Sequence, residues 1–289
     1  MNKNSKSSAF KVLALSVIVG VALPVVALAA PYTQQVNLAT ADNFAVLAGS
    51  AITNTGSTVI NGNVGLAPGS AISGFPPGLI NGTQYIANST ATKAKTDLVT
   101  AYNDAASRTP VTQVIAAGTL GNTTLTPGVY TSADSTFEID GPLTLDGEGD
   151  ASSVFIFKAA SSLITAGAST VILQNGAQAC NVFWQVTSSA TLGTNSIFKG
   201  NILSLTSITA TTGADIVGSL LARNGAVTLD ANTITNETCT GGEAFATPVL
   251  PNTGVGTTNA NFLAPILVSL AVLFVAVSSL YVIRTNQNR

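Results

Sequence analysis

The sequence of 289 residues has no histidine, two cysteines, one methionine, and few charged or aromatic side chains. The absence of histidine excludes Ser-His and Cys-His catalytic pairs and histidine-based metal sites. Charged residues make up 8% of the chain, against about a quarter in a typical soluble domain. Aromatic residues make up only 6%, so we expect a core of Val, Ile, Leu and Ala arranged in regular layers.

Basic residues are especially scarce away from the ends of the chain. The two end segments hold 5 of the 11 basic residues and none of the 13 acidic ones, namely Lys3, Lys6, Lys11, Arg284 and Arg289. The central part therefore has 11 − 5 = 6 basic residues and a net charge of 6 − 13 = −7. A protein that binds nucleic acid needs the opposite sign, so we expect no nucleic acid partner.

Residues 1–29 have the three-part pattern of a secretory signal peptide. Three lysines precede an apolar run over residues 12–26, and Ala27-Leu28-Ala29 provides a small-residue cleavage site. We predict cleavage after Ala29 and export of the protein; an uncleaved membrane anchor is the alternative. Export permits disulfide formation.

The C-terminal region has three consecutive parts. A linker over residues 241–261 contains Leu250-Pro251-Asn252-Thr253-Gly254. An apolar run over 262–283 is long enough to span a bilayer, and the tail 284–289 carries the arginines that favour a cytoplasmic position. This order resembles a sortase sorting signal of monoderm-type bacteria, although the tail carries less charge than usual.

The resemblance implies cleavage between Thr253 and Gly254 and attachment of Thr253 to a surface amine. The expected partners are then sortase, the cell envelope and the membrane, and the expected location is the cell surface, where the C-terminus anchors the protein to the cell wall or membrane. The mature body would comprise residues 30–253, which is 253 − 29 = 224 residues.

Two repeats indicate a β-solenoid. Three similar segments begin at Thr191, Thr209 and Thr228, at spacings of 209 − 191 = 18 and 228 − 209 = 19 residues. A period near 18 is too short for paired-helix repeats but fits one solenoid coil, in which equivalent residues stack about 4.8 Å apart. Gly49-Ser-Ala-Ile-Thr53 also recurs, as Gly69-Ser-Ala-Ile-Ser73, and predicts earlier coils.

One helix is expected, over residues 88–108. Ile86, Ala94, Leu98 and further apolar residues recur at helical spacing, with capping residues at its start and a proline after its end. A helix of roughly 20 residues is about 30 Å long, which matches about six stacked coils. We therefore expect it to lie along one side of the solenoid, whose short strands resume over residues 111–175.

An acidic segment raises the question of a metal site. Asp146, Glu148 and Asp150 alternate in a way that suits Ca²⁺ ligands. Because no glycine-punctuated Ca²⁺-loop repeat accompanies them, we favour a solvated acidic turn and expect no metal and no cofactor.

Cys180 and Cys239 bracket the C-terminal coils. Export and the even count favour a disulfide over two free thiols. A bridge would contribute roughly 4 kcal/mol by the chain-entropy estimate. We expect it to pin the last coil to the body and to help close an exposed solenoid end.

Several specific strings lie between about Leu38 and Cys239, namely Asn43–Gly49, Gly74–Gly78, Leu125–Tyr130, Leu143–Gly147, Val154–Phe157, Asn175–Gln185, Ser188–Gly193 and Leu221–Asp230. Together these strings closely resemble the microbial ice-binding (antifreeze) proteins. The resemblance implies an all-β fold over residues 30–240: a right-handed triangular, discontinuous β-solenoid with one long helix packed alongside. It also implies a monomer whose partner is the surface of an ice crystal.

In the relatives one flat solenoid face binds ice and often carries the pattern Thr-Ala/Gly-x-Thr/Asn. Thr209-Ala210-Thr211-Thr212 fits it in full, whereas the segments that begin at Thr165, Thr191 and Thr228 fit it in part. The resemblance thus implies an ice-binding site, whose residues are Thr165, Thr191, Thr194, Thr209, Thr211, Thr212 and Thr228. Such a surface orders water into an ice-like lattice and makes no bond, so we expect no enzymatic activity and no catalytic residue.

Two alternatives follow from the same solenoid. A surface adhesin or structural wall protein would carry a non-ice ligand, because a fold does not determine a function. A polysaccharide-active enzyme would need clustered carboxylates in a groove with nearby basic residues. Only six basic residues remain in the body and its acids concentrate in one segment, which disfavours the enzyme.

Overall fold

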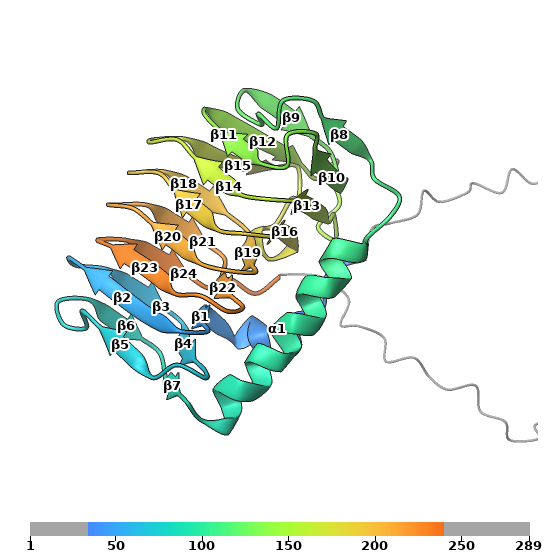
Figure 1. The fold of residues 1–289 in the computed structure, drawn as a ribbon. Helices are drawn as coiled ribbons and strands as arrows, with labels where there is room; N and C mark the ends of the chain where they lie inside the picture. The colour runs from blue at the N-terminus through green and yellow to red at the C-terminus, as the bar shows by residue number, and fades with distance from the viewer. Residues whose placement is uncertain (1–33, 240–289) are drawn as a thin grey trace, which may run out of the picture. The chain divides into compact units, whose positions relative to one another are not determined.

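The computed structural model describes residues 34–239 (Figure 1). The expected signal peptide, sorting motif, membrane span and tail lie outside the described residues, so those expectations stay predictions. Within residues 34–239 no helix is both long enough and apolar enough to cross a membrane.

The described body consists of three parallel β-sheets and one long helix, α1 (Ser89–Ser107). Sheet A has nine strands, in the order β7 (Gln84–Ile86), β4 (Asn63–Leu66), β1 (Phe44–Ala48), β22 (Leu220–Ala222), β19 (Asn201–Ser204), β16 (Val182–Val186), β13 (Phe155–Ala159), β10 (Gly128–Ser132) and β8 (Gln113–Ile115).

The other two sheets have shorter strands. Sheet B has the order β11 (Phe137–Ile139), β14 (Leu163–Thr165), β17 (Ala190–Leu192), β20 (Ile208–Ala210), β23 (Val227–Asp230), β2 (Ala51–Thr55) and β5 (Ala71–Ser73). Sheet C has the order β6 (Leu79–Asn81), β3 (Val59–Asn61), β24 (Thr233–Thr235), β21 (Asp215–Val217), β18 (Ile197–Lys199), β15 (Thr170–Gln174), β12 (Pro142–Asp146) and β9 (Thr123–Leu125).

From β1 to β7, and again from β10 to β24, successive strands belong to sheets A, B and C in turn, so each turn of the chain forms one coil. For example, β16, β17 and β18 supply one strand to each of sheets A, B and C, and β19, β20 and β21 form the next coil. All pairings between coils are parallel, as in Trp184 opposite Ile202. The β-solenoid predicted from the repeats is confirmed.

The coils do not stack in the order of the sequence. The first coil, β1 to β3, lies directly against the last coil, β22 to β24, in all three sheets. Helix α1 then leads from β7 at one end of sheet A towards β8 at the other (Figure 1). The discontinuity that the family resemblance implied is therefore present.

A disulfide joins Cys180 to Cys239, whose Cα atoms lie 5.4 Å apart. Cys180 lies in a short 3-10 helix, Ala179–Asn181, just before β16, and Cys239 follows β24. Both strands are inside their sheets, and the first coil covers the last one. The expectation that the bridge helps close an exposed solenoid end was wrong, because the last coil in the sequence is not at an end of the stack.

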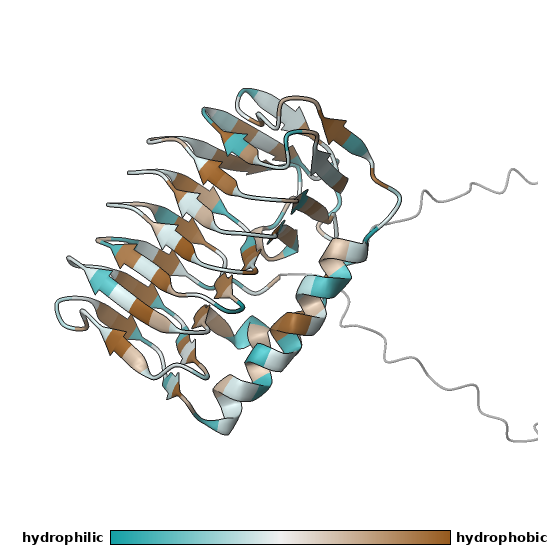
Figure 2. Ribbon diagram, in the orientation of Figure 1, coloured by the Kyte–Doolittle hydropathy of each residue, from teal (hydrophilic) through white to brown (hydrophobic). Residues whose placement is uncertain are grey.

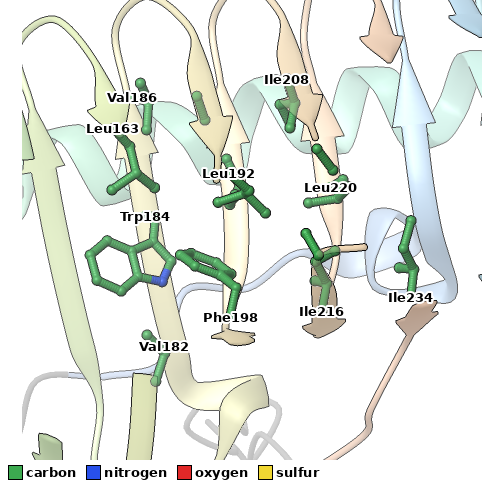
Figure 3. Close-up of a cluster of buried hydrophobic side chains, with 14 of the residues drawn as sticks. Leu163, Val182, Trp184, Val186, Leu192, Phe198, Ile208, Ile216, Leu220 and Ile234 are labelled. Atoms are coloured by element: carbon green, nitrogen blue, oxygen red, sulfur yellow. The ribbon is translucent and has the colours of Figure 1, made fainter. Parts of the chain in front are cut away.

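The solenoid interior is filled by one apolar side chain after another along the stack. Tyr130, Phe157, Trp184 and Phe198 form a row of aromatic contacts, with Phe157 and Trp184 stacked at 4.0 Å between ring centroids. Figure 3 shows aliphatic side chains such as Ile216 continuing this row in the following coils. The aromatic side chains of this interior row thus lie in neighbouring coils, and aliphatic side chains fill the coils that follow.

Helix α1 begins where the sequence predicts, because the Asn88 side chain accepts a hydrogen bond of 2.9 Å from the Ala91 amide and caps its first turn. The helix buries a stripe against sheet A that includes Ala94, Leu98 and Tyr102. The expected helix is confirmed, except that Ile86 lies in β7 and not in this stripe. Because α1 covers sheet A, the outward sides of sheets B and C are the two open faces.

Candidate functional site

The outward side chains of sheet B, here called the sheet B face, form one row in register along the stack. Most of its short strands alternate buried, outward and buried positions, as in Ala190-Thr191-Leu192. Successive Cβ atoms of a strand point to opposite sides, so the outward residue is the one between two buried neighbours. In the end strand β5, the outward residue of this row is the last one, Ser73, and Ile72 points inward. From one end of the sheet to the other, the row reads Glu138, Ile164, Thr191, Thr209, Thr228, Thr53 and Ser73.

Four consecutive positions of this row are threonine. Thr191, Thr209 and Thr228 were predicted from the sequence, and the structure brings them together in adjacent strands. Thr53 follows in the first coil, with its hydroxyl 3.4 Å from that of Thr228. Hydroxyls and methyls therefore repeat at the strand spacing of about 4.8 Å, across the junction between the last and first coils.

The three threonines predicted just after these strands lie at the corner between sheets B and C. The Thr194 and Thr211 hydroxyl oxygens are 3.3 Å apart in adjacent coils. Thr211 also donates to the Leu192 carbonyl oxygen at 2.7 Å, and Thr212 donates to the Asp230 carboxylate. These bonds link neighbouring coils and hold the border of the sheet B face in one conformation.

Thr165 does not belong to the exposed row. Its side chain is only 4% exposed, and its hydroxyl oxygen accepts a 2.8 Å hydrogen bond from the Gly193 amide. Ile164 takes the outward position instead, because it is Ile164 that pairs with Thr191. A shift of one residue in a strand moves a side chain to the other side of the sheet, so aligning the segments by their threonines placed this one wrongly.

Thr53 and Ser73 were missed as site residues. The repeat that contains them predicted early coils, but nothing in the order of the sequence placed those coils beside Thr228. The signal that could have found them is the combination of this repeat with the discontinuous stacking that the family resemblance implied.

The sheet B face carries little charge. Its strands contain two charged residues, Glu138 at one end of the sheet and Asp230 beside the corner. The Asp230 carboxylate accepts a hydrogen bond from the Thr212 hydroxyl, and the Asp230 backbone amide donates to the Asn232 side-chain oxygen at 2.7 Å. No basic residue lies in these strands.

The sheet C face is built differently. One of its outward rows places Asp215 between Ile197 and Thr233, and the neighbouring row contains Lys199. Ile197 is 40% exposed, and Leu79, in the end strand β6, is 54% exposed. Charged and aliphatic side chains therefore interrupt one another on this face. Figure 2 shows that hydrophobic and hydrophilic residues alternate along the solenoid strands in general, as their inward and outward positions require.

The acidic segment is a hydrogen-bonded turn. The Asp146 carboxylate accepts bonds from the Glu148 amide and the Asn175 and Gln174 side chains, and these hydrogen bonds hold the pKa of Asp146 below its usual value. Asp150 likewise accepts from Ser152. Within residues 34–239 no three His, Cys, Asp or Glu side chains come close enough to hold a metal ion.

Known proteins are similar to this chain in both sequence and fold. The chain is 50% identical over 200 residues to the "Ice-binding protein" of Nostoc sp. (strain HG1), which covers 69% of this chain and 73% of the relative. A crystal structure of an ice binding protein from an Antarctic Biological Consortium matches with a TM-score of 0.69 and 48% identity, over 73% of this chain and 95% of that chain. The ice-binding protein from the Antarctic ascomycete Antarctomyces psychrotrophicus matches with a TM-score of 0.68 and 48% identity, over 71% of this chain and 100% of that chain.

The family model described as "Ice-binding-like" matches residues 46–235. This range contains the whole threonine row and all three sheets except the first residues of β1. More than half of the sequence is matched, and the parallel coils with a helix on sheet A agree with the solved relatives. The chain therefore belongs to the ice-binding-like protein family.

Proposed function

We propose that this protein binds ice through the sheet B face. The observation that carries the proposal is the in-register row Thr191, Thr209, Thr228 and Thr53 on an open, weakly charged sheet. The printed names of the relatives support the same activity. Binding makes and breaks no covalent bond, in line with the non-enzymatic function of the family.

The mechanism follows from repetition and rigidity. Threonine methyls order the water above them, while the hydroxyls hold that water at a regular spacing. Each contact is weak, but a rigid sheet loses little conformational entropy on binding, so many weak contacts add up. The buried interior and the corner hydrogen bonds of Thr211 and Thr212 supply that rigidity.

The second open face is less suited to this role. A charged group such as Lys199 or Asp215 holds its own hydration shell, which does not match an ice lattice. The exposed Ile197 side chain lies next to Asp215, and the exposed Leu79 side chain lies at the end of the same row. The sheet B face is therefore the one that we assign to ice.

We further propose that the protein acts at the cell surface. The support is the order of Leu250-Pro251-Asn252-Thr253-Gly254, the apolar run 262–283 and the basic tail. Sortase would join Thr253 to the envelope, so the face would hold the cell to ice or keep ice crystals from the wall. We also infer a right-handed triangular coil from the family resemblance, which a crystal structure of the body would test.

The test uses purified residues 30–253. This body is a suitable unit, because its match to the two solved relatives covers 95% and 100% of their chains. We expect ice shaping and inhibition of ice recrystallisation at micromolar concentration. A body with a β-sheet circular dichroism spectrum and no effect on ice would contradict the ice proposal and favour a surface adhesin.

Anchoring is tested separately. In a sortase-containing host, the full chain should be recovered covalently bound to the cell wall, and Thr253→Ala should release it from the wall fraction. Recovery of both forms in the membrane fraction alone would contradict sortase attachment without affecting the ice proposal.

A further inference from the structure

A pocket with two basic side chains lies between α1 and the solenoid, away from the sheet B row. Its walls come from three segments: the N-terminal half of α1, the turn after β4 and the turn after β22. The lining residues are Ala67, Pro68, Thr92, Lys95, Thr96, Val99 and Arg223. The pocket has a volume of about 290 Å³.

The Arg223 guanidinium has N–H donors without a hydrogen-bond partner among the described residues. It lies over the Tyr102 ring, 4.6 Å from the centroid. Its Nε atom is buried and has no hydrogen-bond partner among the described residues. No hydrogen bond joins the guanidinium to another described residue, so its outer amino groups are the donors that a ligand in the pocket could use.

Lys95 lies beside Arg223, and its ammonium group uses only some of its hydrogen-bond donors. Its ammonium group donates to the Ala222 carbonyl oxygen and, at 2.5 Å, to that of Arg223. An ammonium group has three protons, so one donor remains. Burial, with a smaller contribution from the neighbouring Arg223 charge, lowers the pKa of Lys95 to about 7.

No described acid neutralises this pair. The nearest helix charges, Lys93 and Asp97, form an ion pair with each other, and Asp97 also accepts from Thr40. The turn after β4 contributes only Ala67 and Pro68. The Thr92 and Thr96 hydroxyls donate along the helix to carbonyl oxygens, so the free donors of the pocket are those of Lys95 and Arg223.

We propose that this pocket binds a phosphate or carboxylate group carried on a small, partly apolar molecule. The guanidinium and ammonium donors would hold the oxyanion, since a planar guanidinium suits bidentate contacts with such groups. Ala67, Pro68 and Val99 would contact the apolar part. The site is independent of the proposed ice face, because it uses no residue of the threonine row.

The first experiment titrates sodium sulfate into residues 30–253 at pH 6, with sodium chloride keeping the ionic strength constant. Sulfate keeps its charge across the pH range used. We expect a saturable shift of the Arg223 Nε–H NMR signal. Lys95→Met should weaken binding by about tenfold. Arg223→Lys should have a similar effect, because lysine keeps the positive charge but cannot make the bidentate contacts of a planar guanidinium. Lys93→Met, the matched control on the same helix, should bind like the parent protein.

The pH dependence of binding shows whether Lys95 contacts the anion or only stabilises the fold. Parent affinity for sulfate should fall as the pH rises from 6 to 8.5, because Lys95 loses its proton near pH 7, whereas Lys95→Met should show no such fall. Non-saturable shifts, or equal losses in Lys93→Met and Lys95→Met, would overturn the proposal.

The second experiment identifies the ligand class. Phenyl phosphate and benzoate should both bind more tightly than benzyl alcohol, and the tighter of the two anions gives the preferred group. Equal binding of benzyl alcohol would show that charge is irrelevant and would overturn the proposal. None of these outcomes depends on ice activity.

Discussion

Sheets B and C are made by the same coils, yet their outward faces differ in kind. Both have short strands with buried aliphatic residues on the inside, such as Ile208 in sheet B and Ile216 in sheet C. On the outside, sheet B presents Thr191, Thr209 and Thr228 in register, whereas sheet C places Asp215 in register with Ile197.

The difference teaches that backbone repetition alone does not make a regular surface. In a strand the inward and outward residues alternate, so the outward side chains can vary while the inward side chains maintain the core of each coil. The sheet C row changes residue type from coil to coil, whereas the sheet B row keeps threonine in four consecutive strands between Ile164 and Ser73. A run of identical outward residues on one face only is what selection for contact with a repeating ligand surface would leave, since stability does not require it.

The largest contrast between the two faces should come from a bulky side chain placed on each. Thr209→Tyr would lift the centre of the sheet B face away from ice, so we expect recrystallisation inhibition to fall by about tenfold, or about 1.4 kcal/mol. Thr233→Tyr puts the same ring on the sheet C face as the matched control and should leave activity unchanged. The reverse result would move the site to sheet C.

A smaller effect is expected where the first coil extends the row. Thr53 pairs with Thr228 across the junction, near the end of the face, so Thr53→Tyr should lower activity by about threefold, or about 0.7 kcal/mol. Val59→Tyr, in the sheet C strand of the same coil, is the control. Full activity of Thr53→Tyr, with an unchanged melting temperature, would limit the face to the C-terminal coils.

Most of the fold could be predicted because its signals are local. The period near 18, the helical spacing before Arg108 and the Thr repeats each lie within a short stretch of sequence. The neighbours of the first coil could not be predicted from periodicity, since Thr53 and Thr228 are separated by 175 residues. The misplacement of Thr165 has a different cause: composition does not fix a register, and only pairing with Thr191 shows that Ile164 faces outward.

A charge placed on each face gives a finer comparison. Ile164 and Ile197 are matched, at 42% and 40% exposure, on sheets B and C. Ile164→Lys would put a strongly hydrated ammonium at the border of the threonine row, so we expect about a twofold loss of ice activity, or about 0.4 kcal/mol. Ile197→Lys should have no effect, because the sheet C face already carries Lys199. Equal losses in both variants, measured in the same ice assay, would mean that net charge and not the face determines the result.

The smallest effect concerns the corner that joins the two faces. Five successive coils turn this corner through a residue with positive φ, and the residues are Ala168, Asn195, Gly213, Ala231 and Gly56. Alanine is disfavoured there by about 1–2 kcal/mol, while glycine loses more backbone entropy on folding. Ala231→Gly should therefore stabilise the body by about 0.5–1 kcal/mol and leave ice activity unchanged.

Urea unfolding measures this change as a higher midpoint at the same slope. Ala106→Gly, in the last turn of α1 on its exposed side, is the control for a glycine at a position with ordinary helical backbone angles. It should destabilise the body by up to about 1 kcal/mol. If Ala231→Gly gained stability but lost ice activity, the corner would set the angle or order of the sheet B face as well as its stability. The contrast between the two faces would then depend on the backbone, and the outward side chains alone would not account for it.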